Sequence, residues 1–449
     1  MIDRQERVRE LLFLLFFGIF IVLWAVIQPL NVSPDEPMRY RICQYLYENH
    51  VLPPHGGDPS IRDAAWGYSY AFFPILPQMI GALFMTIVSW FSKTAFVLLM
   101  AARMVSVLSG VGTAWFALRI GEKLWGKTMP KWLFTIFITM LPQFVFLCSY
   151  VNSDSFAVFA TSMIIYSWLL GLESGWSYRS CITMAVGIIL CALCYYDAYG
   201  VILSSILLLL GNILLWWKNR EKRRDLIKKS LLIGGLVLLG ISWWFIRNGI
   251  LYQGDFLGLA TSEAYSQRYA VDFLKPTNRQ VPSRVGDNLW CMLTSWGWIK
   301  VTGISFIGCF GYMNIPLKTW MYIIYAATVA VGVVAAVLQL VRHGIEGQDG
   351  FPGTKMQNRM WIAALVLTAV VPNLLNLSHS YYVDYQPQGR YSMPMLLPLM
   401  YFVTVGWQYI AGKRRRWLLV GIGILWPVLT VYIYLTIYYP ATIVAISSR

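Results

Sequence analysis

Long apolar runs that follow one another along the chain limit what it can fold into. Most are about 18 to 25 residues long, and roughly 20 apolar residues suffice for a helix to cross the hydrocarbon core of a bilayer. Of the 449 residues, 57% are hydrophobic and only 13% are charged, whereas soluble domains carry about 25% charged residues. We therefore predict an all-α integral membrane protein in which residues 1–449 form a single polytopic domain.

About eleven of these runs are expected to be transmembrane helices. They are 11–30, 95–119, 133–150, 155–172, 180–197, 200–217, 230–248, 318–341, 361–378, 391–411 and 417–438. The apolar stretches 72–92 and 289–316 are not counted, because the first contains Pro74 and Pro77 and the second contains Lys300 and several glycines. Both are expected to form interfacial or re-entrant helices, which are tolerated where protein covers the backbone.

The distribution of Lys and Arg supports this choice of spans. Counting the first stretch alone as a span would place 218–229, with its seven Lys and Arg, outside, and counting the second alone would place 413–416 outside. Either outcome violates the positive-inside bias. We therefore expect a cytoplasmic N-terminus and two long external segments, 31–94 and 249–317. The formal net charge of +15 then sets orientation and does not indicate nucleic-acid binding.

Some features are expected to be structural only. The seven cysteines lie mostly in or beside apolar runs, so they do not indicate a disulfide framework. Cys191 and Cys194 have the spacing of a redox or metal motif, but they lie within an apolar helix without further ligands, which favours a buried structural role. The segment 342–360 is expected to be a flexible cytoplasmic connector.

The sequence SPDEPMRY at 33–40, directly after the first span, contains the strongest candidate site. Prolines on both sides restrict the backbone around Asp35 and Glu36. A carboxylate held there could act as a general base toward a hydroxyl, or it could cap the helix that begins near Pro37. The residues alone leave both interpretations open. Because adjacent side chains diverge, we expect only one of the two acids to reach a given proton.

Two further acids occur where other predicted helices meet the external face. Asp154 follows Asn152, between the third and fourth spans, and on its own it favours an N-cap. Asp197 follows two tyrosines at the outer end of the fifth span. The four histidines are scattered and do not indicate a metal site.

Some basic residues are predicted to lie on the external side, against the general bias of Lys and Arg toward the cytoplasm. Arg390 lies in the sequence QPQGRYSMP at 386–394, which opens the tenth predicted span. The planar guanidinium of Arg suits phosphate binding, although an interfacial Arg can also simply extend toward water. We take Arg390, Tyr391, Arg247 and Tyr40 as candidate substrate-binding residues.

These motifs resemble those of the GT-C superfamily of polytopic glycosyltransferases, which use polyprenyl-phosphate-linked sugars. The acidic pair after the first helix, the proline-containing stretch 70–77, and Arg103 with the Ser-Gly at 109–110 carry this resemblance. Four short motifs are also similar to a bacterial multi-pass membrane family long catalogued as of unknown function. They are PDEP at 34–37, NxD at 152–154, FxxxFGY at 306–312 and GRYxxP at 389–394.

The resemblance implies roles for individual residues. Asp35 would be the catalytic base, with Glu36 beside it, Asp154 would be a second site acid, and Arg390 and Tyr391 would lie at the lipid-phosphate subsite. A divalent metal, if one binds, would be held by Asp35 and Asp154, although we find no third acid. The large soluble C-terminal domain of some members is absent from this sequence.

We therefore expect a glycosyltransferase at the outer face of a bacterial plasma (inner) membrane. It would move a sugar from a polyprenyl-phosphate donor lipid to a hydroxyl of a glycan or lipid-linked acceptor. Its partners would include membrane lipids but no nucleic acid. The alternatives are a transporter or flippase of a lipid-linked glycan and a non-catalytic assembly subunit. Transporters place charged groups near the membrane midplane, whereas the polar residues of this sequence gather at the outer helix ends.

Overall fold

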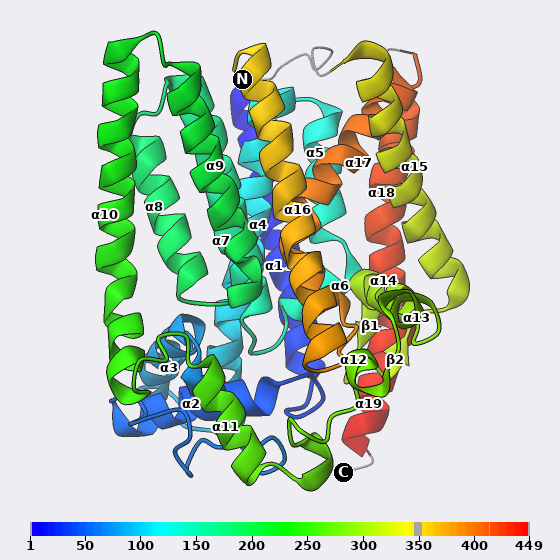
Figure 1. Cartoon of the computed structure of the whole chain (residues 1–449). Coiled ribbons are helices and arrows are strands. Elements are labelled where there is room, and N and C mark those ends of the chain that lie inside the picture. Colours follow the sequence, from blue (N-terminus) through cyan, green and yellow to red (C-terminus); the bar gives the residue numbers. More distant parts are fainter. Residues whose placement is uncertain (1, 345–352, 413, 448–449) are drawn as a thin grey trace.

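A bundle of long helices forms the body of the protein (Figure 1). The computed structural model describes residues 2–344, 353–412 and 414–447. Within these residues, eight helical segments are long and apolar enough to cross a membrane. The helices that supply them are α1 (Ile2–Ile27), α4 (Ala95–Trp125), α7 (Asp154–Ser174), α9 (Gly200–Leu215), α10 (Arg220–Leu251), α15 (Thr319–His343), α16 (Lys355–Tyr382) and α18 (Arg416–Ile433). The predicted all-α membrane class is confirmed.

Three of the predicted spans correspond to shorter helices. These are α5 (Met129–Thr139) with α6 (Pro142–Leu147), α8 (Tyr178–Ala192), and the 3-10 helix η5 (Gly389–Met395) with α17 (Leu396–Ala411). Pro142 separates α5 from α6, because proline lacks the N–H that would continue the helical hydrogen bonding. Hydropathy alone did not reveal these interruptions.

The segments 31–94 and 249–317 form short elements instead of long spans. The first contains α2 (Glu36–Asn49), η1 (Tyr70–Phe72) and α3 (Leu76–Ser89). The second contains α11 (Leu259–Tyr269), η3 (Asp272–Leu274), α12 (Pro282–Val285), α13 (Leu289–Thr294) and α14 (Trp298–Gly308). A two-residue antiparallel ladder of β1 (Cys309–Phe310) and β2 (Ile315–Pro316) departs from the all-α expectation.

These short elements gather at one end of the bundle. Figure 1 shows α2, α3 and α11 at the end opposite the N-terminus, and the turn between α9 and α10 at the N-terminal end. The basic segment 218–229 therefore lies far from both predicted external segments. The C-terminal elements, the π-helical turn η6 (Tyr434–Tyr438) and α19 (Tyr439–Ser447), lie at the same end as α2.

The expectations for the cysteines and the connector have different outcomes. All seven cysteines are free, and Cys191 and Cys194 are buried, as predicted. Of the connector predicted at 342–360, residues 345–352 lie outside the described residues.

Candidate active site

Asp35 occupies an unusual backbone conformation at the start of α2. Its φ is +61°, in the left-handed region that few non-glycine residues adopt. Its side chain makes no capping hydrogen bond to α2. The carboxylate instead forms an ion pair with Arg390, with 2.7 Å between Oδ2 of Asp35 and Nη1 of Arg390. The capping interpretation is therefore wrong for Asp35.

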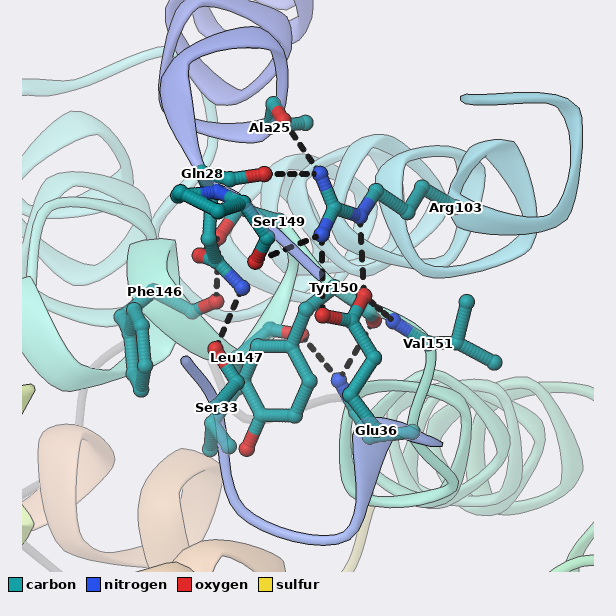
Figure 2. Close-up of polar contacts among 12 residues, drawn as sticks. Ala25, Gln28, Ser33, Glu36, Arg103, Phe146, Leu147, Ser149, Tyr150 and Val151 are labelled. Atoms are coloured by element: carbon teal, nitrogen blue, oxygen red, sulfur yellow. Dashed lines mark hydrogen bonds and ion pairs between the residues drawn. The ribbon is translucent and has the colours of Figure 1, made fainter. Parts of the chain in front are cut away.

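Glu36 has a different environment from that of Asp35 (Figure 2). Both of its carboxylate oxygens accept hydrogen bonds from the guanidinium of Arg103, at 2.8 Å each, and both side chains are fully buried. The backbone N–H of Val151 also donates to Glu36, at 3.0 Å. Arg103 donates in addition to the carbonyl oxygens of Ala25 and Gln28 at the end of α1. The pair thus joins α1, α2, α4 and the segment before α7.

The buried contacts of Glu36 indicate a structural role for this residue. Its oxygens accept three hydrogen bonds from Arg103 and Val151, and no water-accessible surface remains on its side chain. The two acids of the predicted Asp-Glu pair therefore lie in two different environments, since Asp35 retains 18% side-chain exposure. The side chains of Asp35 and Glu36 diverge, as expected for adjacent residues.

Asp154 is buried at the first turn of α7, close to the Asp35 site. The cap is supplied by Asn152, whose Oδ1 accepts hydrogen bonds from the backbone N–H and the hydroxyl of Ser155. The N-cap interpretation of Asp154 is therefore wrong. Both carboxylate oxygens of Asp154 are buried and have no hydrogen-bond partner in the protein. They interact electrostatically with Arg390 and Arg39.

Arg39 is a second buried cation at the site, one helical turn after Asp35. Its Nη1 donates to the hydroxyl of Ser153 at 2.7 Å, and its guanidinium lies over the ring of Tyr70, 4.0 Å from the ring centre. Its buried Nε has no partner, and no acid of the described residues lies within ion-pair distance of it. Arg39 therefore keeps hydrogen-bond donors that the protein does not use.

Sequence reasoning did not assign a role to Arg39. The signal was available, because Arg39 lies beside the candidate acids in a segment predicted to be external and opposes the charge bias there in the same way as Arg390.

A close approach between η5 and α14 positions Arg390. Gly389 packs so tightly on α14 that a Cβ there would lie 2.1 Å from the backbone nitrogen of Phe306. The N–H of Gly389 donates to the hydroxyl of Ser305 at 2.8 Å. The predicted motifs 306–312 and 389–394 thus meet in space. Arg390 also donates to the hydroxyl of Tyr391, at 3.0 Å.

A cavity of about 480 Å³ opens beside these residues, within the roughly 300–1,000 Å³ typical of small-ligand sites. It lies among α2, η1, α16, η5 and η2 (Tyr196–Tyr199). Its polar lining includes Arg39, Tyr70, Tyr195, Asp197, His379 and Tyr391. Of the two buried Arg residues at the site, the one that lines this cavity is Arg39.

Two predicted substrate-binding residues lie elsewhere. Tyr40 packs in an apolar cluster with Cys43 and Met85. Arg247 donates to the carbonyl oxygen of Pro53, and its guanidinium lies over the ring of Trp244. The structure therefore brings together Asp35, Asp154, Arg390 and Tyr391, but it does not bring Tyr40 or Arg247 to the cavity.

The neighbouring cations control the ionisation of Asp35. Burial alone would raise the pKa of the Asp35 carboxyl, but Arg390 and Arg39 outweigh it, and the pKa lies below its usual value. Burial and the nearby charge of Asp35 raise the pKa of Tyr70 well above its usual value. Asp35 is therefore ionised at neutral pH, and the Tyr70 hydroxyl beside it stays protonated and favours the charged form of Asp35.

The residues at the site are a poor fit to a divalent metal. The described residues contain no group of three or more His, Cys, Asp or Glu side chains that could hold an ion. Asp35 is already paired with Arg390, and the guanidinium groups of Arg39 and Arg390 would repel a dication beside Asp154. Arg39 and Arg390 provide the positive charge beside Asp35 and Asp154 that a metal ion would otherwise provide.

Known proteins resemble the chain in structure and not in sequence. No family model matches it, and no curated protein matches it. The archaeal oligosaccharyltransferase AglB from Archaeoglobus fulgidus, in complex with an inhibitory peptide and a dolichol-phosphate, superimposes with a TM-score of 0.54 at 11% identity, over 96% of this chain and 56% of AglB. ArnT from Cupriavidus metallidurans, bound to undecaprenyl phosphate, gives 0.54 at 13% identity, over 92% of this chain and 63% of ArnT. The chain has the GT-C fold.

The chain spans only about half to two thirds of the length of the proteins it matches, 56% of AglB and 63% of ArnT. A second structure of the Archaeoglobus fulgidus oligosaccharyltransferase, a complex with Zn and sulfate, gives a TM-score of 0.55 at 12% identity over 93% of this chain. At these identities the likeness establishes the fold alone. The similarity to the bacterial family of unknown function stays a prediction.

Proposed function

We propose that this GT-C chain is a glycosyltransferase that moves a sugar from a polyprenyl-phosphate carrier to an acceptor hydroxyl. The observation that carries the proposal is the ionised Asp35 carboxylate, held by Arg390 next to a cavity that Arg39 lines. Such a transfer requires a base for the hydroxyl proton, a cation for the phosphate and a cavity for the substrate. The solved proteins of the same fold were determined with dolichol-phosphate or undecaprenyl phosphate, which supports a lipid phosphate as the donor.

The reaction uses Asp35 as a general base. The acceptor hydroxyl attacks the anomeric carbon, a new carbon–oxygen bond forms, and the bond from that carbon to the phosphate oxygen breaks. The hydroxyl proton passes to Asp35, and the bond electrons leave with the lipid phosphate. In-line attack inverts the anomeric centre. Because phosphate is a good leaving group, the step requires no strong general acid.

Arg39 is the cation best placed to bind the leaving phosphate. It lines the cavity, makes no ion pair within the described residues, and has an unused Nε donor. Phosphate binding would use the planar set of donors that is specific to Arg. Arg390, which the sequence favoured for this role, already binds Asp35 and Tyr391. We assign Arg390 to holding the base.

The remaining features of the proposal concern location and substrates. The site lies at the end of the bundle away from the basic segment 218–229, which supports action at the outer face of a bacterial inner membrane with the N-terminus in the cytoplasm. The donor carries a hexose or a pentose, and the acceptor is a cell-envelope glycan or a lipid-linked glycan. A donor that remains in the bilayer explains a site at the membrane boundary.

The test uses purified protein in detergent or nanodiscs with undecaprenyl-phosphate sugars. Transfer to added acceptor glycans, or slow hydrolysis in their absence, is followed by mass spectrometry of the lipid products. Asp35→Asn is the test variant, since it keeps the size of the side chain and removes the base. We expect turnover to fall at least about 10²-fold in this variant, the usual scale for loss of a general base.

Two results would count against the proposal. Equal turnover in the parent and in Asp35→Asn would remove the base from the mechanism. Movement of the intact carrier across liposome membranes, with no sugar released, would favour the transporter alternative.

A further inference from the structure

Asp197 is an acidic residue of the cavity that the proposed reaction does not use. It lies in η2, the short 3-10 helix between α8 and α9, and its side chain is partly exposed where it lines the cavity. Tyr195 and Tyr196 of the same segment also line the cavity. Gly200 packs this segment closely against α16, because a Cβ there would lie 2.9 Å from Val371. The position of Asp197 is therefore fixed by packing.

The carboxylate of Asp197 has unused hydrogen-bonding capacity. A carboxylate can accept about four hydrogen bonds, and the Tyr195 hydroxyl is a neighbouring donor that favours the charged form of Asp197. No Lys, Arg or His of the described residues lies within ion-pair distance of it. A carboxylate that is partly withdrawn from bulk water without such partners is stabilised when a ligand completes its hydrogen bonds.

The opposite charge of the cavity limits what that ligand can be. Arg39 lines the same cavity and is the residue assigned to the donor phosphate. A phosphate is repelled by Asp197, so the group that meets Asp197 must be a hydrogen-bond donor attached to the same molecule. The sugar of a polyprenyl-phosphate donor meets this condition, because its hydroxyls follow directly after the phosphate. Tyrosine rings beside Asp197 provide flat surfaces for a sugar ring.

We propose that Asp197 recognises the transferred sugar by accepting hydrogen bonds from two neighbouring ring hydroxyls. This inference rests on the proposed function, and it deepens it by naming the group that selects the sugar. Arg39 and Asp197 then divide the donor between them, with the phosphate at the first and the sugar at the second. A donor with a hydroxyl missing at the contacted position leaves Asp197 unpaired and binds more weakly.

The experiment compares two ligands in each variant. Dissociation constants are measured for bare undecaprenyl phosphate and for undecaprenyl phosphate carrying glucose, N-acetylglucosamine or arabinose. The variants are Asp197→Ala, Asp197→Asn and the control Asp272→Asn, which removes an acid whose side chain is 90% exposed in the second external segment. Since a hydrogen bond to a charged group is worth about 1.5–3 kcal/mol, Asp197→Ala should weaken the best sugar-bearing carrier by about tenfold to a hundredfold.

The expected pattern is specific to the sugar. Bare carrier should bind all variants within about twofold, which also shows that the variants are folded, and Asp197→Asn should be intermediate. A deoxy form of the best sugar should bind the parent weakly but lose little further affinity in Asp197→Ala. Equal weakening of bare and sugar-bearing carrier, or no weakening at all, would overturn the role of Asp197. A parent protein that prefers none of the sugar-bearing carriers to bare carrier would overturn the proposed donor itself.

Discussion

Glu36→Gln should destabilise the protein much more than its conservative chemistry suggests. The Glu36 carboxylate and the Arg103 guanidinium are both fully buried and share two hydrogen bonds of 2.8 Å. A glutamine keeps one oxygen acceptor but turns an NH₂ group toward a guanidinium donor. The variant thus leaves a buried positive charge without its counter-charge.

The structure gives the expected size of this effect. Removing one partner of a buried ion pair costs about 3–5 kcal/mol, which changes the unfolding equilibrium by about 10²- to 10⁴-fold. Replacing both residues together, as Glu36→Met with Arg103→Met, removes the stranded charge. It also leaves the carbonyl oxygens of Ala25 and Gln28 and the N–H of Val151 without these partners. At about 1–3 kcal/mol for each of these three groups, the double variant should itself lose about 3–9 kcal/mol and recover little of the parent's stability.

Reversible unfolding in mixed detergent micelles measures these differences. The four proteins of the double-variant cycle give the coupling energy between Glu36 and Arg103, which should be large and favourable. Transfer activity is measured below the unfolding midpoint, where folded Glu36→Gln should retain more turnover than Asp35→Asn. A Glu36→Gln protein as stable as the parent, yet inactive, would refute the structural assignment and make Glu36 the base.

Further predictions concern the cations and the packing of the site. Arg39→Lys keeps the charge but loses the planar donors, so affinity for bare undecaprenyl phosphate should fall about tenfold, and an unchanged affinity would contradict the phosphate assignment. Because the pKa of Asp35 lies below its ordinary 3.8, the base form persists as pH falls, and the loss of activity from this group should be centred below that ordinary value. In Arg390→Gln the acid limb of the kcat/KM profile should move to higher pH. An acid limb that stays in place would exclude an effect of Arg390 on the pKa of Asp35. Gly389→Ala should lower stability by about 1–3 kcal/mol and reduce activity, whereas Gly421→Ala, where a Cβ meets nothing within 4 Å, should do neither.

The membrane class was predictable because hydropathy and charge bias act over whole segments. Long apolar runs and the basic segment 218–229 do not depend on any single side chain. The interruption at Pro142 and the 15-residue length of α8 were not predicted, because buried short helices and long spans have the same composition. Local turn chemistry at 389–395, which produces η5, was also hidden inside an apolar run.

The site was predictable only in part, because some contacts join residues far apart in the chain. The sequence brought attention to Asp35, Asp154 and Arg390, and the structure places Arg390 in contact with Asp35 and in electrostatic range of Asp154. It did not predict that Arg103, 67 positions away, would neutralise Glu36. It also assigned the helix cap to Asp154, although Asn152, two residues earlier, has an amide oxygen in reach of the same turn.

Arg390 and Arg39, both predicted to lie on the external side, differ in how their charges are paired. Arg390 is neutralised by Asp35, so by itself it adds little net charge to the cavity. Arg39 has both Asp35 and Asp154 in electrostatic range but neither at ion-pair distance. A cation that only stabilised the fold would be expected to pair with the unpartnered oxygens of Asp154. Because Arg39 lies instead on Tyr70 at the cavity wall, its unused donors are available to an anion, and the lipid phosphate is the anion that the proposed reaction supplies.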